Sequence, residues 1–469
     1  MKKQMMAAAL MALAAGGAAR ADDLRADQVA FRSLYKELVE TNTTLSAGDC
    51  TLAARRMAAH LKSAGYGDQD IRIVVPDGQP RFGALIATLP GSDAKAKPIL
   101  LLAHIDVVEA KREDWQRDPF TLVEENGYFY GRGSSDDKAM ASIFADMMVR
   151  FKQEGFKPKR PLKLALTCGE ETPDNFNTVA ELTAKEPVAL DAAFGLNEGA
   201  GGRLDKEGNR IALEIQAGEK VYQDFALETV NPGGHSSRPR KDNALYQLTA
   251  GLNRLAAYDF PVVFNPVTKA YFSAMAKITS GPAAADLAAL AGDNPDPAAV
   301  ARISQDPGWN STLRTTCVAT MMEAGHAPNA LPQHAKANVN CRILPGTPVP
   351  EVLKTLQEVV ADPGIKVSTV GALSPVSPPP PLTEQILGPV RKVAARMWPG
   401  VPLVPTMATG ATDGRFLNAA GVPVYGLSGI FRDPDGSGVH GLNERIRVRS
   451  LYEGRDFLTE VVKIYATQN

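Results

Sequence analysis

Three largely apolar runs of strand length, separated by segments with helical spacing, most constrain the fold of this chain. The runs cover residues 99–103, 162–168 and 192–196. Such runs are typical of strands that are buried on both faces of a parallel sheet. Between the first two lies an amphipathic segment, residues 138–155, whose apolar residues recur at helical spacing. Strands that alternate with helices predict an α/β fold with a mostly parallel sheet flanked by helices.

Each of these runs leads into residues that can bind a metal or move a proton. His104-Ile105-Asp106 follows the first run, Glu170-Glu171 the second, and Glu198 the third. The carboxyl ends of parallel strands meet at one edge of a sheet, where open α/β sheets bind ligands. A single Glu-Glu pair is usually a solvated loop, but acids at several strand ends favour one shared site.

Two further segments add candidate ligands to this site. Asp136 follows a glycine-rich turn and precedes a predicted helix, and His440 lies in a glycine-flanked loop at residues 438–444. A carboxylate at such a turn can bridge two cations, and paired metals in hydrolases need such a bridge. Histidine and carboxylate ligands without thiolates are typical of zinc.

The helical and strand pattern changes near residue 216 and returns after a proline-rich linker. Residues 217–375 read as β-α-β-β-α-β, a ferredoxin-like α+β pattern. We therefore predict a catalytic domain built from residues 22–216 and 376–469, with residues 217–375 inserted as a separate domain, the lid. The lid includes a segment rich in proline, aspartate and alanine, residues 259–309, which carries no chemistry of its own.

The N-terminus and the net charge indicate location and exclude some partners. Residues 1–21 combine a Met-Lys-Lys start, an apolar stretch and a small-x-small site before Asp22. This pattern predicts a signal peptide cleaved after Ala21, and hence a secreted or periplasmic protein without a membrane span. The alternative is a cytosolic protein with an apolar N-terminal helix. A net charge of −1 gives no reason to expect nucleic-acid binding.

The chain has four cysteines, Cys50, Cys168, Cys317 and Cys341, and no Cys-x-x-Cys motif. Cysteine-bound zinc is therefore not expected. An exported chain can form disulfides, and Cys317 and Cys341 could lie on neighbouring strands. We nevertheless expect buried free thiols.

Several motifs resemble those of the M20 metallopeptidases, which include glutamate carboxypeptidase, aminoacylase, succinyl-diaminopimelate desuccinylase and the carboxypeptidase S group. The motifs are His104-Ile105-Asp106-Val107-Val108, Trp115 with Asp118-Pro119-Phe120, and Gly-Arg-Gly-x-x-Asp-Asp-Lys at residues 131–138. The resemblance covers residues 22–468 in chain order. Ala139 departs from it, because a glycine commonly stands there. The long segment at 259–309 is similar to that of the carboxypeptidase S-like branch.

The resemblance implies a role for each candidate in the catalytic domain. One Zn²⁺ would be held by His104, Asp136 and Glu198, and a second by Asp136, Glu171 and His440. Co²⁺ or Mn²⁺ could replace zinc. Glu170 would be the general base, and Asp106 would orient His104. The peptide bond between Asp136 and Asp137 would be cis.

The resemblance also assigns functions to the lid. His235, in the motif Gly234-His235-Ser236-Ser237, would stabilise the oxyanion of a neighbouring active site. Asn329 and Arg342 would bind the carboxylate of the substrate, because a guanidinium pairs bidentately with a carboxylate. A homodimer formed through the exposed edge of the lid sheet would bring His235 to the partner. The alternative is a monomer, in which residues 259–309 cover this edge or supply the contact within one chain.

These expectations define a secreted di-zinc hydrolase of peptides or N-acyl amino acids with a free carboxylate. Within the enzyme class, the alternative is an aminopeptidase or dipeptidase that reads a free amine. A non-catalytic periplasmic peptide-binding protein is the rival from another class. A serine hydrolase using Ser236 is a third, although Ser236 lacks a nucleophile-elbow motif.

Overall fold

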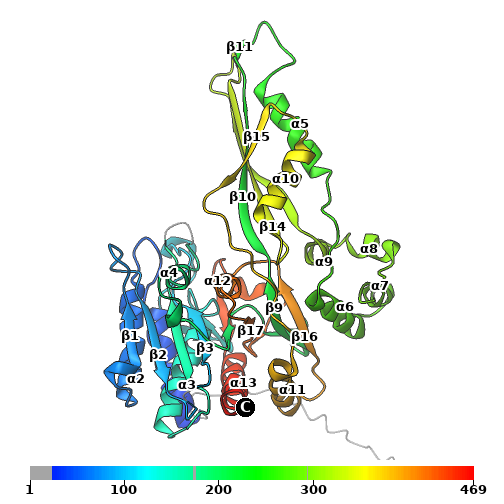
Figure 1. The fold of residues 1–469 in the computed structure, drawn as a ribbon. Helices are drawn as coiled ribbons and strands as arrows, with labels where there is room; N and C mark the ends of the chain where they lie inside the picture. The colour runs from blue at the N-terminus through cyan, green and yellow to red at the C-terminus, as the bar shows by residue number, and fades with distance from the viewer. Residues whose placement is uncertain (1–23, 94, 173–175, 293, 469) are drawn as a thin grey trace, which may run out of the picture.

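The computed structural model describes residues 24–93, 95–172, 176–292 and 294–468, which form a broad α/β body and an elongated lid that projects from it (Figure 1). The predicted signal peptide lies outside the described residues. Within the described part of the chain, no helix combines the length and the apolar character that a membrane span requires.

The body is built on one sheet of ten strands among the described residues. Its strands, in spatial order, are β1 (Ile71–Val74), β2 (Ala84–Leu89), β6 (Leu162–Thr167), β3 (Ile99–His104), β7 (Phe194–Asn197), β17 (Val424–Gly426), β9 (Arg210–Glu219), β8 (Gly202–Leu204) and β18 (Phe431–Arg432), with β16 (Leu403–Ala408) beside β9. The central strands β6, β3, β7 and β17 run parallel to one another. This architecture confirms the predicted α/β class.

Helices cover both faces of this sheet because its central strands are apolar on both sides. In β3, Ile99 and Leu101 belong to one hydrophobic core, while Leu100 and Leu102 belong to another. The first core contains α1 (Ala26–Glu40), α2 (Cys50–Ser63), α3 (Lys138–Gln153), α11 (Glu384–Met397) and α13 (Val448–Thr467). The second contains α4 (Thr178–Lys185) and α12 (Gly414–Ala419). A small sheet of β4 (Val123–Glu125), β5 (Tyr128–Tyr130) and β19 (Arg445–Arg447) flanks the body.

The lid is a four-stranded antiparallel sheet with helices on one face, as the ferredoxin-like pattern predicts. Its strands follow the order β12 (Thr316–Ala324), β14 (His334–Ile343), β10 (Val221–Val230) and β15 (Ile365–Val370). Helices α5 (Ala244–Ala256) and α10 (Val349–Val360) pack on it through one core. Lys220 alone separates β9 of the body from β10 of the lid. At the far tip of the lid, β11 (Gly234–His235) pairs with β13 (Ala330–Leu331) (Figure 1).

The segment at residues 259–309, which the sequence assigns to the lid, packs against the body instead. It forms α6 (Pro266–Ile278), α7 (Pro282–Leu290), α8 (Pro297–Ile303) and the start of α9 (Pro307–Leu313). Apolar residues of these helices share a core with Ala212 of β9 and Val404 of β16. The segment therefore covers the end of the main sheet, and the exposed strand β12 remains an edge of the lid.

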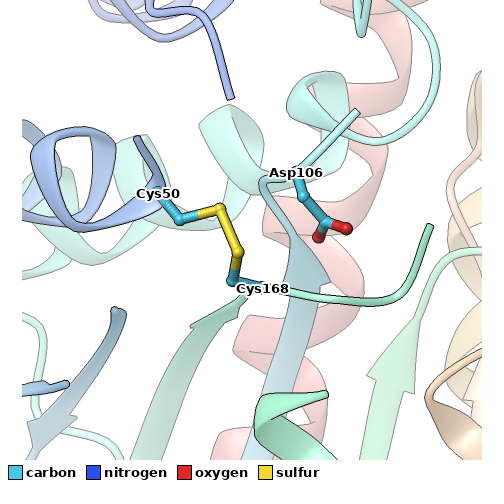
Figure 2. Close-up of side chains that lie close together, drawn as sticks. All are labelled: Cys50, Asp106 and Cys168. Carbon is cyan, nitrogen blue, oxygen red and sulfur yellow. A yellow bond between two sulfur atoms is a disulfide. The ribbon is translucent and has the colours of Figure 1, made fainter. Parts of the chain in front are cut away.

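The expectation of free thiols is wrong, because all four cysteines are paired. Cys317 on β12 and Cys341 on β14 are directly opposite each other and form a disulfide with a Cα–Cα distance of 4.1 Å. Cys50, at the start of α2, is bonded to Cys168, just after β6 (Figure 2). This second disulfide joins residues 118 positions apart, so no local sequence pattern pointed to it.

Candidate active site

The sheet places the predicted catalytic residues together at the carboxyl ends of its parallel strands. His104 is the last residue of β3, Glu170 and Glu171 follow β6, and Glu198 directly follows β7. Asp136 lies in the turn before α3, where the Asp136–Asp137 peptide bond is cis, in agreement with the resemblance. His440 reaches the same place from the loop that precedes β19.

Asp136 lies between the two histidines. Its Oδ1 is 3.1 Å from Nε2 of His104, and its Oδ2 is 3.1 Å from Nε2 of His440. On the outer sides, His104 Nε2 is 3.6 Å from Oε1 of Glu198, and His440 Nε2 is 3.0 Å from Oε2 of Glu171. The contacts thus group the five residues into the two sets that the resemblance implies, and Asp136 is common to both.

The donor atoms are close enough to fit metal ions. Ligand atoms of His104, Asp136 and Glu171 lie within 4.8 Å of one another, and so do those of His104, Glu170 and Glu198. The chemistry of this set, imidazole nitrogens with carboxylate oxygens, is that of zinc sites in hydrolases. Cys50, Asp106 and Cys168 are also close together, but both sulfurs belong to the disulfide and cannot act as thiolate ligands.

Asp106 orients His104, but mainly through its backbone. The Nδ1 of His104 is 3.1 Å from the carbonyl oxygen of Asp106 and 3.7 Å from its carboxylate. A proton on Nδ1 that is donated to this carbonyl leaves Nε2 free to act as a ligand. The carboxylate of Asp106 instead accepts a hydrogen bond from the backbone N–H of Glu171, at 3.0 Å. Asp106 therefore links the ends of β3 and β6.

The electrostatics of the site favour the binding of a cation. The pKa of Glu198 is raised to about 8, mainly by burial; His104 lowers it, and the neighbouring carboxylates of Asp136 and Glu171 raise it. Burial also raises the pKa of Glu170. Hydrogen bonds that His440 donates to the carboxylates of Asp136 and Glu171 raise its pKa to about 10. Both carboxylate oxygens of the buried Asp137 have no hydrogen-bond partner among the described residues. Bound cations stabilise such crowded carboxylates.

Glu444, which the sequence analysis overlooked, holds the turn that carries Asp136. Its buried carboxylate accepts hydrogen bonds from the backbone N–H groups of Gly133, Ser135 and Asp136, at 2.8–3.0 Å, and pairs with Arg132 at 2.8 Å. Because Glu444 is four residues from His440, it couples the position of the second histidine to that of the shared carboxylate. The one sequence feature that pointed to Glu444 was its position in the loop at 438–444, which also contains His440.

Asp413 is a second overlooked residue, behind the turn of Glu170. Its carboxylate accepts hydrogen bonds from Thr167 Oγ1 at 3.2 Å and from Asn177 Nδ2 at 2.6 Å. The same Asn177 Nδ2 donates to the carbonyl oxygen of Gly169 at 3.1 Å. These contacts fix the backbone that places Glu170 and Glu171 at the end of β6.

The lid residues divide into two groups. His235 is exposed in β11, at the tip of the lid that lies farthest from the body (Figure 1). Asn329 accompanies it, since its carbonyl oxygen accepts from the N–H of Ser236 at 3.0 Å. Arg342 lies instead at the base of the lid, opposite Tyr222 on β10. Within one chain, the fold therefore does not bring His235 or Asn329 to the histidine and carboxylate cluster.

Comparisons with known proteins give consistent matches. A sequence model of peptidase family M20/M25/M40 matches residues 100–464. The N-fatty-acyl-amino acid synthase/hydrolase PM20D1 of Mus musculus is 30% identical over 386 residues, which cover 80% of this chain and 76% of that protein. Aminoacylase-1 of Mus musculus is 24% identical over 445 residues, or 93% and 95% of the two chains. The fold is shared with an M20 family metallo-carboxypeptidase of Sulfolobus solfataricus, with a TM-score of 0.71, 18% identity and coverage of 94% and 100%.

Proposed function

This chain belongs to peptidase family M20/M25/M40 and is a metal-dependent amide hydrolase, and on that premise we propose that it uses two zinc ions to cleave peptides or N-acyl amino acids with a free carboxylate. The observation that carries the proposal is the carboxylate of Asp136 between two histidines, with Glu170 beside them. The similarity to a protein named as an N-fatty-acyl-amino acid hydrolase supports the acyl amino acid class.

His104, Asp136 and Glu198 would hold one zinc ion, and Asp136, Glu171 and His440 the other. When bound, such a pair of ions supplies an acidified water and an electrophile for the substrate carbonyl. The residues of the chain do the rest. Asp106 keeps His104 in one tautomer, and Glu444 keeps Asp136 in place through the turn at 133–136.

Glu170 would carry the proton during the reaction. Its carboxylate would take a proton from the attacking water and return it to the nitrogen of the leaving amine. A buried carboxylate with a raised pKa suits this task, because it holds a proton more readily than an exposed carboxylate does. The imidazole of His235 would stabilise the negative charge that develops on the carbonyl oxygen.

A pair of glutamine variants tests these roles. Glu170→Gln should lower kcat by about 10²-fold or more, because the proton carrier is lost, while the zinc content measured by elemental analysis stays at the wild-type level. Glu171→Gln should lower the zinc content as well as activity. Normal turnover by Glu170→Gln would overturn the base assignment. Wild-type protein that binds zinc in this cluster but hydrolyses no amide substrate would instead favour a binding protein.

A matched substrate panel tests the carboxylate requirement. N-acyl amino acids and dipeptides should be cleaved, and conversion of the carboxylate to an amide should abolish turnover. Retained activity on the amides, combined with a requirement for a free amine, would identify an aminopeptidase or dipeptidase instead.

A homodimer would supply the missing oxyanion contact. His235 lies at the lid tip, and the edge strand β12 exposes the apolar residues Val318, Met321 and Met322. Pairing of two lid edges around a two-fold axis would bury these side chains and carry His235 to the partner. Mixed His235→Ala and Glu170→Gln subunits should then regain activity from the one intact composite site. No recovery, with subunit exchange shown independently, would contradict this arrangement.

Export of the protein completes the proposal. The two disulfides support it, since disulfides persist in oxidising compartments and are rare in the cytosol. N-terminal sequencing of the protein from a periplasmic or extracellular fraction should begin at Asp22. An intact Met1 on a cytosolic pool of the protein would contradict cleavage and export.

A further inference from the structure

A cluster of positive side chains lies at the junction of body and lid around Lys220, where β9 continues into β10; this junction is called the hinge. Arg342 comes from β14 of the lid, Arg415 from α12 of the body, and Lys220 from the single residue that joins β9 to β10. All three side chains are buried or partly buried. The mechanism above uses none of them, and the resemblance implies a role only for Arg342, as a ligand of the substrate carboxylate.

Arg342 has no carboxylate partner among the described residues. Its guanidinium lies over the ring of Tyr222, 4.7 Å from the ring centre. Asp224, an acid on the neighbouring strand β10, is engaged elsewhere: its Oδ2 accepts from the hydroxyl of Tyr222 at 2.6 Å. Its Oδ1 accepts from the side-chain amides of Asn338 and Asn340, at 3.1 and 2.8 Å. Arg342 therefore retains its N–H donors for a ligand.

Arg415 is in a similar situation on the other side of the hinge. It lies in the first turn of α12, with its guanidinium 4.6 Å from the ring centre of Phe416, and the described part of the chain gives it no ion pair. The start of this helix is firmly held. Thr412 N–H donates to Glu219 at 2.8 Å, and Asp413 is fixed by Thr167 and Asn177. Glu219 and Asp413 are close enough for Arg415 to lower their pKa values, but burial of both carboxyl groups outweighs it.

Contacts on both sides of Lys220 connect the two arginines: Lys220 donates to Thr316 of the lid sheet, and its chain neighbour Glu219 accepts from Thr412 at the start of α12. Burial lowers the pKa of Arg342, and the charge of Arg415 lowers it further, while Tyr222 and Asp224 act in the opposite direction. Lys220 adds a third positive charge near the two arginines. Its Nζ donates to Thr316 Oγ1 at 3.2 Å, and Thr316 lies opposite Arg342 in the lid sheet. Desolvated like charges without an anion between them are unfavourable, so an anion that enters the hinge is strongly stabilised.

We propose that Arg415 of the body and Arg342 of the lid together hold the carboxylate of the substrate, so that the anion is bound across the hinge. The inference rests on the proposed function, which requires a free carboxylate on the substrate. The resemblance implies Arg342 as one ligand of this carboxylate, and the inference adds Arg415 as a second. A carboxylate has lone pairs for two guanidinium forks, and a planar fork pairs with it bidentately. Asp413, two residues before Arg415, contacts the turn of Glu170 through Asn177. The same hydrogen-bonded residues therefore fix the position of Arg415, which would hold the substrate carboxylate, and the position of Glu170, the general base.

The test is a comparison of two substrates in three variants of the full chain. The substrates are an N-acyl amino acid and the same compound with its carboxylate converted to a methyl ester. Arg415→Met should lower kcat/KM for the acid by about 10- to 100-fold, the range of a hydrogen bond to a charged group, and leave kcat/KM for the ester unchanged. Arg415→Lys should show a smaller loss, through KM rather than kcat. Arg391→Met, at an exposed arginine paired with Glu384, is the matched control and should behave as wild type.

The outcomes separate this inference from the proposed function. Equal loss for acid and ester in Arg415→Met would make Arg415 structural and overturn the inference. An unchanged acid-to-ester ratio in Arg415→Met, together with a collapsed ratio in Arg342→Met, would overturn the inference and leave the proposed function intact. A wild-type enzyme that does not distinguish acid from ester would overturn both. If Arg415→Met fails to fold, the ratio in Arg415→Lys decides the question in the same way.

Discussion

Removal of the disulfide between Cys50 and Cys168 should destabilise the body strongly and leave catalysis at low temperature nearly intact. The bond closes a loop of 118 residues that contains β1, β2, β3, α3 and β6. In the chain-entropy description of cross-links, a loop of this length corresponds to about 5 kcal/mol of stability. The lid disulfide closes only 24 residues, which corresponds to about 3.5 kcal/mol.

Catalysis should be less affected because hydrogen bonds also hold the turn after β6. Thr178 N–H donates to the carbonyl oxygen of Cys168 at 2.9 Å, and Thr178 Oγ1 accepts from Cys168 N–H at 3.3 Å. Asn177 fixes the carbonyl of Gly169. These contacts remain when the sulfurs are removed, so Glu170 and Glu171 keep their positions in the folded protein.

Differential scanning calorimetry of Cys50→Ala/Cys168→Ala should show the transition of the body lowered by about 10–20 °C, at 2–4 °C per kcal/mol for a domain of moderate size. The matched variant Cys317→Ala/Cys341→Ala should lower the transition of the lid and not that of the body. A shift of the body transition below about 3 °C in Cys50→Ala/Cys168→Ala would refute the loop-closure reasoning. A large loss of kcat at 10–20 °C, well below the transition, would refute the claim that hydrogen bonds alone keep Glu170 and Glu171 in position.

Three further predictions follow from buried charges. Glu444→Gln should lower the free energy of unfolding by about 3–5 kcal/mol, because Arg132 is left buried without its counter-charge. It should also lower the affinity for zinc, because the turn that carries Asp136 is displaced. An unchanged melting temperature and an unchanged zinc titration would contradict this prediction. Arg455→Met should cost about 3 kcal/mol in denaturant unfolding, because it removes the charged hydrogen bond at 2.8 Å to the buried Asp146; a cost below about 0.5 kcal/mol would contradict it. In the metal-free protein prepared by chelation, the free energy of unfolding should fall as pH rises from about 5 to 8. The reason is that the pKa of Glu198 in the folded state, about 8, lies above its value in the unfolded state. Chelated Glu198→Gln should show a weaker pH dependence than the chelated wild type, and the zinc-loaded wild type should not show it.

Local patterns were sufficient for the strands and for the metal-site candidates. The runs at 99–103 and 162–168 became β3 and β6 almost without change, because their apolar residues can be buried only between two layers of helices. Once the strands are parallel, the residues that follow them must share one edge. His104, Glu170, Glu171 and Glu198 could therefore be grouped before any contact was known.

The residues that hold these candidates in place could not be identified in the same way. Glu444 acts on backbone N–H groups more than 300 positions earlier in the chain, and Asp413 acts on Thr167 and Asn177. Isolated acids in loops have no periodicity or spacing that distinguishes them from solvated surface residues. Only the packed fold shows that both are buried and that their oxygens accept several hydrogen bonds.

The sequence by itself determined the α/β class, the lid pattern and the inventory of histidines and carboxylates, because each depends on residues within one strand, helix or turn. The tertiary structure alone decided that Cys50 meets Cys168, that the helices at 266–313 cover the body, and that Arg415 and Arg342 share the hinge. These pairings depend on how separate elements pack. Packing is set by the summed burial of many side chains, and no short stretch of sequence records that sum.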